Sequence, residues 1–397
     1  MNRPDVPRAG ARLEIDIDYL REQLEGLLAV PSPTGYTDNA VRHLCGELDK
    51  LGVGYDLTRR GAVRAHLRGQ SANGARAVVG HLDTLGAQVK ALKPNGRLEL
   101  VPIGSWSARF AEGARTIIFS EKGAYRGTIL PLRASGHTFG DEVDTLPVGW
   151  EHVELRVDAY ASSVDDLTHL GIDVGDIVAI DPQPEFLDNG FIVSRHLDNK
   201  AGCAIMMAAL KALKEGAEAP PVDIYWLFTI AEEVGHGAAS ILLPDIAEMV
   251  AVDNGTSAPG QNSSEFGVTI AMADMTGPFD FHLTRRLVEL CDAHDIRRRK
   301  DVFRHYRSDS ASAVEAGADV RTALITFGVD ASHGYERIHM HALRSCSELL
   351  TVFTLSDMEL KRDARPISGL AGFPRQPTLP AVQALSPDSR PPEGETD

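Results

Sequence analysis

The sequence predicts an α/β fold, in which a mostly parallel mixed sheet is flanked by helices and carries an inserted small β-rich domain. Two observations lead to this prediction. Short apolar segments alternate with amphipathic helical segments towards both ends of the chain, which is typical of a parallel sheet covered on both faces. Between them, residues 88–190 contain many short strand patterns and glycines, and only one helical pattern at 162–171.

The N-terminal part, residues 1–87, begins with two helical patterns and continues with strands. Residues 17–30 are amphipathic, and a second helical pattern at 40–52 is stopped by Gly52. Residues 53–81 then form short β-branched or apolar runs bounded by Gly and Asn, which predict successive strands of one sheet.

The C-terminal part, residues 191–362, completes the same domain by alternating strands and helices. We expect strands at 222–230, 248–253, 267–272, 300–304 and 320–327, and helices at 199–216, 236–243, 279–295, 310–317 and 341–361. Residues 363–397 are rich in Pro and charge and poor in periodic apolar positions, so we expect a disordered tail there.

Composition narrows the possible functions. The 397 residues carry a net charge of −16, and this overall negative field disfavours binding to nucleic acid or to anionic membranes. The apolar runs fall short of the roughly 20 residues that a membrane span needs, and we find no secretory signal. Four widely separated cysteines without a C-x-x-C pair predict reduced core thiols, and hence a cytoplasmic protein.

Acidic and imidazole side chains follow several of the predicted strands. Ligands of open α/β sheets gather at the carboxyl ends of the strands, so these side chains are expected to meet. One such residue is more often the cap of the next helix, whereas several together indicate a metal site. The candidates are His81, Asp83, Glu232, Glu233, Asp253 and His333.

The tripeptide His-Leu-Asp at 81–83 and the later Asp198 are the first candidates. In an extended segment, residues two apart point to the same side, so Asp83 can accept a hydrogen bond from the ring of His81. Asp198 stands at the start of a predicted helix, where it could simply cap the free amides. Its two oxygens could instead bridge two cations about 3.5–4 Å apart, as in two-metal hydrolases.

The adjacent pair Glu232 and Glu233 follows an apolar strand. Two neighbouring carboxylates repel each other unless a cation or a shared proton compensates. Gly235 and Gly237 permit a turn that brings both acids to one site, one as a metal ligand and the other as a general base. The alternative is a solvated pair at a helix start.

The full ligand set contains two histidines and three carboxylates. Oxygen and imidazole ligands suit Zn, Co or Mn and argue against copper or iron–sulfur chemistry. His196, two residues before Asp198, could compete as a ligand. The set consists of His81, Asp198, Glu233, Asp253 and His333.

The order H-x-D, D-N-K-A-G, E-E-V-G, V-D and a late S-H resembles that of the dinuclear metallopeptidases. The likeness runs from about Leu27 to Leu360 and is to family 42, the glutamyl and tetrahedral aminopeptidases. In the family 20 relatives, a second domain lies between the fourth ligand and the final His. Here the long stretch, with the β-rich insert, lies between His81 and Asp198 instead.

The resemblance implies a zinc-peptidase-like fold with two divalent metal ions, Zn first and Co or Mn as alternatives. His81, Asp198 and Asp253 would hold one ion, and Asp198, Glu233 and His333 the other. Glu232 would be the general base, and Asp83 would orient His81. Residues 1–87 and 191–362 would form the catalytic domain, residues 88–190 would serve in dimerisation or as a lid, and the chain would form homo-oligomers, from dimers up to dodecamers.

The implied activity is that of a metal-dependent aminopeptidase, in which a metal-bridging hydroxide attacks a peptide or amide bond of a small peptide. Two stretches depart from the family pattern near the expected substrate pocket. Arg307-Ser308 replaces Gly-Gly or Gly-Thr, and residues 334–337, Gly-Tyr-Glu-Arg, replace Ser-Pro. The second departure resembles a subgroup associated with the N-acetylglutaminylglutamine amide osmoprotectant system, which gives the alternative of an amidohydrolase or deacylase of an N-acylated dipeptide.

Two rivals come from other classes. A glycoside hydrolase would need only Glu232 and a second carboxylate, and would leave His81, Asp253 and His333 without a role. A non-catalytic scaffold would use the metals as structural clips, and would not need the base that Glu232 provides.

Overall fold

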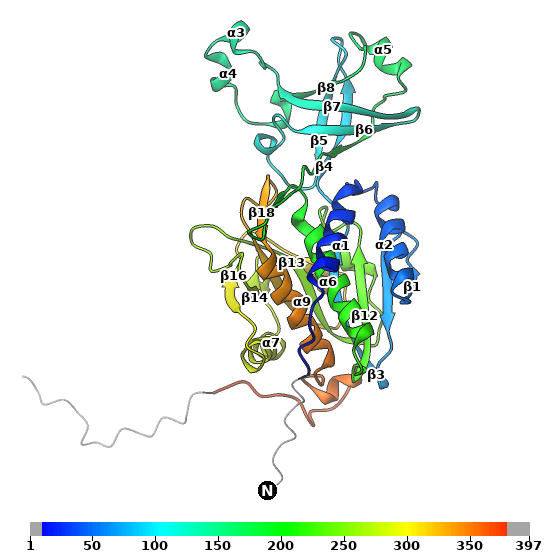
Figure 1. Cartoon of the computed structure of the whole chain (residues 1–397), viewed down its shortest axis with the longest axis vertical. Coiled ribbons are helices and arrows are strands. Elements are labelled where there is room, and N and C mark those ends of the chain that lie inside the picture. The colour runs from blue at the N-terminus through cyan, green and yellow to red at the C-terminus, as the bar shows by residue number, and fades with distance from the viewer. Residues whose placement is uncertain (1–9, 379–397) are drawn as a thin grey trace, which may run out of the picture.

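The computed structural model describes residues 10–378, and its larger part is built on a nine-stranded mixed sheet (Figure 1). The strand order is β1-β2-β12-β3-β13-β17-β14-β15, with β16 paired to β14. Neighbours in the run β12-β3-β13-β17 are parallel, as predicted, and the pairs β1/β2, β2/β12, β17/β14 and β14/β15 are antiparallel. The strands are β1 Gly54–Leu57, β2 Val63–Leu67, β3 Ser71–His81, β12 Val222–Thr229, β13 Ile246–Thr256, β14 Val268–Asp274, β15 Gly277–Pro278, β16 Arg298–Val302 and β17 Arg321–Val329.

Helices flank the sheet and bury its apolar side chains. The long apolar helix α6 contacts α1, α9, β3 and β13, which explains why nearly all of its side chains are buried. The shorter α8 packs against β3, β13 and β17 together with the 3-10 turn η3. The helices are α1 Ile17–Ala29, α2 Asp38–Lys50, α6 Leu197–Glu215, α7 Phe281–Ala293, α8 Asp309–Glu315 and α9 Met340–Leu355, and η3 is Gly237–Ser240.

The inserted β-rich domain is confirmed as a closed antiparallel barrel, in the strand order β4-β5-β8-β7-β6-β9. It stands at one end of the molecule, above the sheet in Figure 1. Its core is separate and includes Leu98, Ile118, Ile129 and Leu155. Its strands are β4 Gly86–Leu92, β5 Arg97–Ile103, β6 Arg115–Ser120, β7 Gly123–Pro131, β8 Val153–Val157 and β9 Ile177–Ile180.

The barrel carries more helical turns than the sequence predicts. The predicted helix is present as α5, Val164–His169, with Ser163 as its cap. Two further helices, α3 Gly136–Phe139 and α4 Glu142–Thr145, and the 3-10 turns η1 Ala108–Phe110 and η2 Trp150–His152 were not predicted. Each spans four residues or fewer, which is too short to show a helical period.

A small three-stranded antiparallel sheet lies near the junction of the two domains. It pairs β10, Glu185–Phe186, with β11, Phe191–Ser194, and β11 with β18, Glu336–His339. The strand β18 was not predicted, because its residues Glu-Arg-Ile-His include only one aliphatic side chain. This pairing places the start of β18 beside the segment that leads into α6.

Two predicted helices are shorter in the structure. The helix predicted at 236–243 is only the turn η3, because Pro244 cannot continue a helix and β13 already begins at Ile246. The last helix, predicted to reach residue 361, ends at Leu355. At this end of the helix, where the last carbonyls lack the partners that a further turn would provide, the guanidinium of Arg76 donates to the carbonyls of Phe353 and Ser356.

The predicted tail falls only partly within the described residues. Residues 363–378 are mostly exposed, although Asp363 forms an ion pair with Arg321 of β17. Residues 379–397 lie outside the described part of the chain.

The four cysteines are buried free thiols, as predicted. Burial raises the pKa of both Cys203 and Cys291 to about 12, so these thiols stay protonated. Between residues 10 and 378, no helix is both long and apolar enough to cross a membrane.

Candidate metal centre

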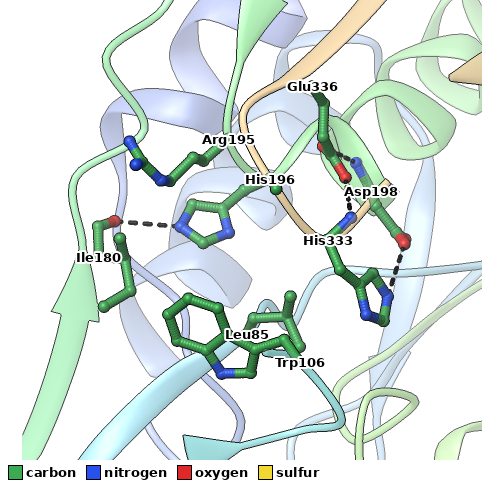
Figure 2. A pocket seen from close by; sticks show the side chains of 9 residues that line it. Leu85, Trp106, Ile180, Arg195, His196, Asp198, His333 and Glu336 are labelled. Atoms are coloured by element: carbon green, nitrogen blue, oxygen red, sulfur yellow. Dashed lines mark hydrogen bonds and ion pairs between the residues drawn. The ribbon is translucent and has the colours of Figure 1, made fainter. Parts of the chain in front are cut away.

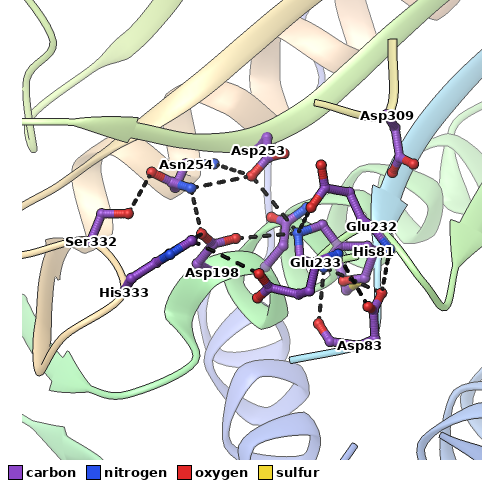
Figure 3. A network of polar contacts seen from close by, with 12 residues as sticks. His81, Asp83, Asp198, Glu232, Glu233, Asp253, Asn254, Asp309, Ser332 and His333 are labelled. Carbon is purple, nitrogen blue, oxygen red and sulfur yellow. Dashed lines mark hydrogen bonds and ion pairs between the residues drawn. The ribbon is translucent and has the colours of Figure 1, made fainter. Parts of the chain in front are cut away.

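The predicted site residues meet at the carboxyl ends of the parallel strands (Figure 3). His81 is the last residue of β3, and Asp253 lies near the carboxyl end of the neighbouring strand β13. Glu232 and Glu233 follow β12, and His333 follows β17. Because β12, β3, β13 and β17 are adjacent in that order, their ends bring these side chains to one place.

Asp198 lies at the centre of this cluster. Its Oδ1 is 3.2 Å from Nε2 of His81, and its Oδ2 is 3.3 Å from Nε2 of His333. The two oxygens therefore face two different imidazoles. The alternative role as a helix cap is not observed, because His196 occupies the cap position of α6 and Asp198 follows inside the first turn with non-helical dihedral angles.

Two groups of three residues could each hold a metal ion. In one, ligand atoms of His81, Asp198 and Asp253 all lie within 4.8 Å of one another. In the other, the same holds for Asp198, Glu233 and His333. The structure thus brings together all five predicted ligands, in the two sets that the resemblance implies.

Glu232 stands beside these groups and belongs to neither of them. Its Oε2 is 3.8 Å from Nε2 of His81. The predicted turn is present: Gly235 has a φ of 81° and donates its amide to the carbonyl of Glu232. Consequently, both glutamates reach the cluster although they are neighbours in the sequence.

Asp83 contacts His81 differently from the prediction. The ring Nδ1 of His81 is 2.9 Å from the backbone carbonyl of Asp83 and 3.6 Å from its carboxylate. The carboxylate instead accepts hydrogen bonds from the amides of Glu232 and Glu233 and from the hydroxyl of Thr34. Asp83 therefore faces both the His81 ring and the acidic turn.

Burial of so many carboxylates needs compensation. Burial raises the pKa of Glu233 and Asp253 well above the usual range and that of Glu232 to about 8. Oε1 of Glu233 is buried and has no hydrogen-bond partner among residues 10–378. Burial opposes protonation of His333, but the carboxylates of Asp198 and Glu233 raise its pKa to about 10. Oxygen and imidazole donors with this excess of negative charge fit divalent cations.

His196 is not part of the cluster. Its Nε2 bonds to the backbone carbonyl of Ile180 at 3.0 Å. Burial lowers the pKa of its ring to about 4, so the ring stays neutral. The suggestion that His196 competes as a ligand is therefore wrong in this structure.

Several polar residues around the candidate ligands were not among the predicted site residues. Nδ2 of Asn254 donates to Oδ2 of Asp198 at 2.6 Å, and Ser332 donates to Asn254. Asp309 is buried beside Glu232, and its Oδ2 accepts from the hydroxyl of Thr229. In the sequence, Asn254 is indicated only by its position directly after the candidate ligand Asp253.

The cluster opens into a cleft of about 750 Å³. Glu232, Glu233, Asp253 and His333 lie in its wall, as does Arg307. Gly104 and Ser105 of the barrel domain also line the cleft, so both domains contribute to it.

Comparison with known proteins identifies the family. A family model described as M42 glutamyl aminopeptidase matches residues 61–349. The chain belongs to the M42 family. YhfE of Bacillus subtilis is 35% identical over 338 residues, which are 85% of this chain and 97% of that protein. The lysyl aminopeptidase of Pyrococcus furiosus is 26% identical over 225 residues, which are 55% of this chain and 61% of that protein.

Solved structures share the fold. The aminopeptidase APDkam598 from the archaeon Desulfurococcus kamchatkensis has a TM-score of 0.75 at 23% identity, covering 85% of this chain and 94% of that chain. Membership of the M42 family makes the chain a metallopeptidase that hydrolyses peptide bonds. Neither the glycoside hydrolase nor the non-catalytic scaffold is therefore retained.

Proposed function

We propose that this M42 protein is a dinuclear metallo-aminopeptidase that removes N-terminal residues from small peptides. The observation that carries the proposal is the position of Asp198, whose two oxygens lie 3.2 Å and 3.3 Å from the imidazoles of His81 and His333. His81, Asp198 and Asp253 would hold one ion, and Asp198, Glu233 and His333 the other. The donor set suits Zn best, with Co or Mn as alternatives.

When bound, the two cations polarise the scissile carbonyl and lower the pKa of the attacking water. The protein's own side chains transfer the proton of the water and position the groups around it. The carboxylate of Glu232, which lies outside both ligand groups, accepts the proton of the water and passes it to the leaving amine. The carboxylate of Asp83 positions the turn that carries Glu232 and Glu233. The backbone carbonyl of Asp83 positions the ring of His81.

Assembly and location complete the proposal. Related structures of Pyrococcus horikoshii TET1 are described as a tetrahedron or a large octahedral shell, and one of PhTET1 as a dodecamer. By analogy, this chain would form homo-oligomers, and the barrel would serve in dimerisation or as a lid over the cleft. Four buried free thiols suit a cytoplasmic location.

The decisive experiment combines metal analysis of the purified protein with a substrate panel. The panel pairs each dipeptide or aminoacyl amide that has a free N-terminus with its N-acylated counterpart. We expect about two divalent ions per chain and cleavage only of the free-amine member of each pair. Exclusive cleavage of the acylated members would overturn the aminopeptidase assignment in favour of the amidohydrolase alternative, and a metal-free active enzyme would overturn the metal centre.

A further inference from the structure

Glu336 lies between the two chain segments that carry Asp198 and His333. Its Oε2 accepts a hydrogen bond from the backbone amide of Asp198 at 3.1 Å. Its Oε1 accepts one from the backbone amide of His333 at 3.0 Å. Figure 2 shows the carboxylate beside both residues, and Glu336 is only 1% exposed. A single buried side chain therefore connects two residues of one candidate ligand group.

The local fold explains how one residue reaches both segments. Glu336 is the first residue of β18 and pairs with Ser194, the last residue of β11. The chain continues from Ser194 to Asp198 on one side, while His333 precedes Glu336 by three residues on the other. Antiparallel pairing thus places both backbones next to the start of β18, where the Glu336 side chain lies.

Both segments contain residues with positive φ angles, a conformation that residues other than glycine rarely adopt. The φ angles of His196, Ala331 and His333 are 65°, 58° and 64°, respectively. Such conformations persist only where the surroundings impose them. Glu336 provides part of this constraint, because it bonds to the amide of His333 itself and to that of Asp198, two residues after His196.

The ring of His333 is oriented independently of its backbone. Its Nδ1 lies 2.9 Å from the carbonyl of Ser105 in the barrel domain, which directs Nε2 towards Asp198. Ser105 therefore fixes the rotation of the ring, whereas Glu336 fixes the position of the backbone from which the ring extends.

We propose that Glu336 is a positioning residue of the metal centre, which sets the spacing of Asp198 and His333 and thereby the affinity for the ion held by Asp198, Glu233 and His333. This inference rests on the proposed dinuclear function. Glu336 does not touch the reacting atoms; it acts through the two ligands whose amides it binds. It lies in the Gly-Tyr-Glu-Arg stretch at residues 334–337.

The test is a Co²⁺ titration of the metal-free full-length protein, followed by visible absorption and by competition with a chelator. Glu336→Gln keeps the size of the side chain but places an NH₂ group against one of the two amide donors, so one hydrogen bond is lost. We expect the dissociation constant of one of the two Co²⁺ equivalents to rise about 10- to 100-fold, with a changed absorption spectrum for that equivalent.

The control is Arg337→Gln, on the next residue of the same strand. Arg337 is 44% exposed and pairs with Glu265 and Asp330, neither of which belongs to a candidate ligand group. Its variant should bind both Co²⁺ equivalents as the wild type does. If Glu336→Gln bound both Co²⁺ equivalents with the affinity and spectrum of the wild type, the role of Glu336 would be overturned but the proposed function would stand. If the wild-type protein itself bound no Co²⁺, the proposed function would be overturned as well.

A second measurement does not depend on the folding of a variant. Hydrogen exchange of the metal-free wild type, resolved to single residues, should show slow exchange for the amides of Asp198 and His333. The amide of Ser332, in the same loop, should exchange faster, because no hydrogen bond from it is observed among the described residues. Equally fast exchange of the His333 and Ser332 amides would contradict the role of Glu336.

Discussion

Oδ1 of Asp83 lies 3.1 Å from the backbone nitrogen of Glu232 and accepts its hydrogen bond. The bond connects the ends of two neighbouring parallel strands, since His81 of β3 pairs with Thr229 of β12. The turn that carries the proposed base is thus attached to the segment that carries the first proposed ligand.

Replacing Asp83 by Asn tests this connection. The new NH₂ group would oppose an amide donor, so Glu232 should move relative to His81. We expect kcat to fall about 10- to 100-fold and stability to fall by about 1–3 kcal/mol. Steady-state kinetics and urea unfolding measure the two effects, with Asp188→Asn in the exposed β10–β11 turn as the control. Unchanged kcat would show that this connection does not matter for catalysis.

Asp198→Ala should remove both metal ions, because each candidate ligand group includes this residue. Adding Zn²⁺ should raise the melting temperature of the wild type but not that of the variant, since only binding to the native state stabilises it. Elemental analysis after dialysis provides the direct measurement. Full metal content in the variant would exclude Asp198 from the site.

The sequence predicted those parts of the fold and the site that depend on local pattern. Alternating strands and helices predicted the sheet, and acidic and imidazole residues after strands predicted the candidate ligands, because parallel strands end at one edge. What escaped prediction depends on contacts between distant segments. Glu336 and Asp198 are 138 residues apart, and Thr229 and Asp309 are 80 residues apart, so no local pattern indicates their hydrogen bonds.

The amino-terminal side of the sheet contains another long-range contact that the sequence did not predict. Arg76 and Glu248 are fully buried, with 2.7 Å between Nε and Oε2, on the paired strands β3 and β13. Arg76 also donates to three backbone carbonyls at the end of α9, those of Phe353, Ser356 and Asp357. The pair therefore attaches the last helix to the sheet at a distance from the metal centre.

Arg76→Met should destabilise the protein by about 3–5 kcal/mol, because the carboxylate of Glu248 would be left buried without its counter-charge. Lys50→Met provides the matched control: Lys50 is 72% exposed in its pair with Glu47, and its loss should cost about 0–1 kcal/mol. Urea unfolding measures both. A similar small cost for the two variants would show that water or a rearranged side chain compensates Glu248.

The pair Glu232 and Glu233 allows the proposed base to be separated from the proposed ligand. Glu232→Gln keeps the size of the side chain and removes only the proton acceptor, so the metal content should persist while kcat falls by roughly 10²- to 10⁴-fold. Glu233→Gln should instead weaken the ion held with Asp198 and His333, because Glu233 belongs to that ligand group.

Measuring kcat and bound metal on both variants distinguishes these roles from a simple electrostatic one. If the glutamates only favoured a nearby helix start, each variant would change stability by about 0.3–1 kcal/mol and keep near-normal kcat. Their burial already argues against a solvated pair, as does Oε1 of Glu233, which has no hydrogen-bond partner in the described part of the chain. A Glu232→Gln enzyme that retains both its metal and its full kcat would contradict the mechanism, because no proton acceptor would then be needed at this position.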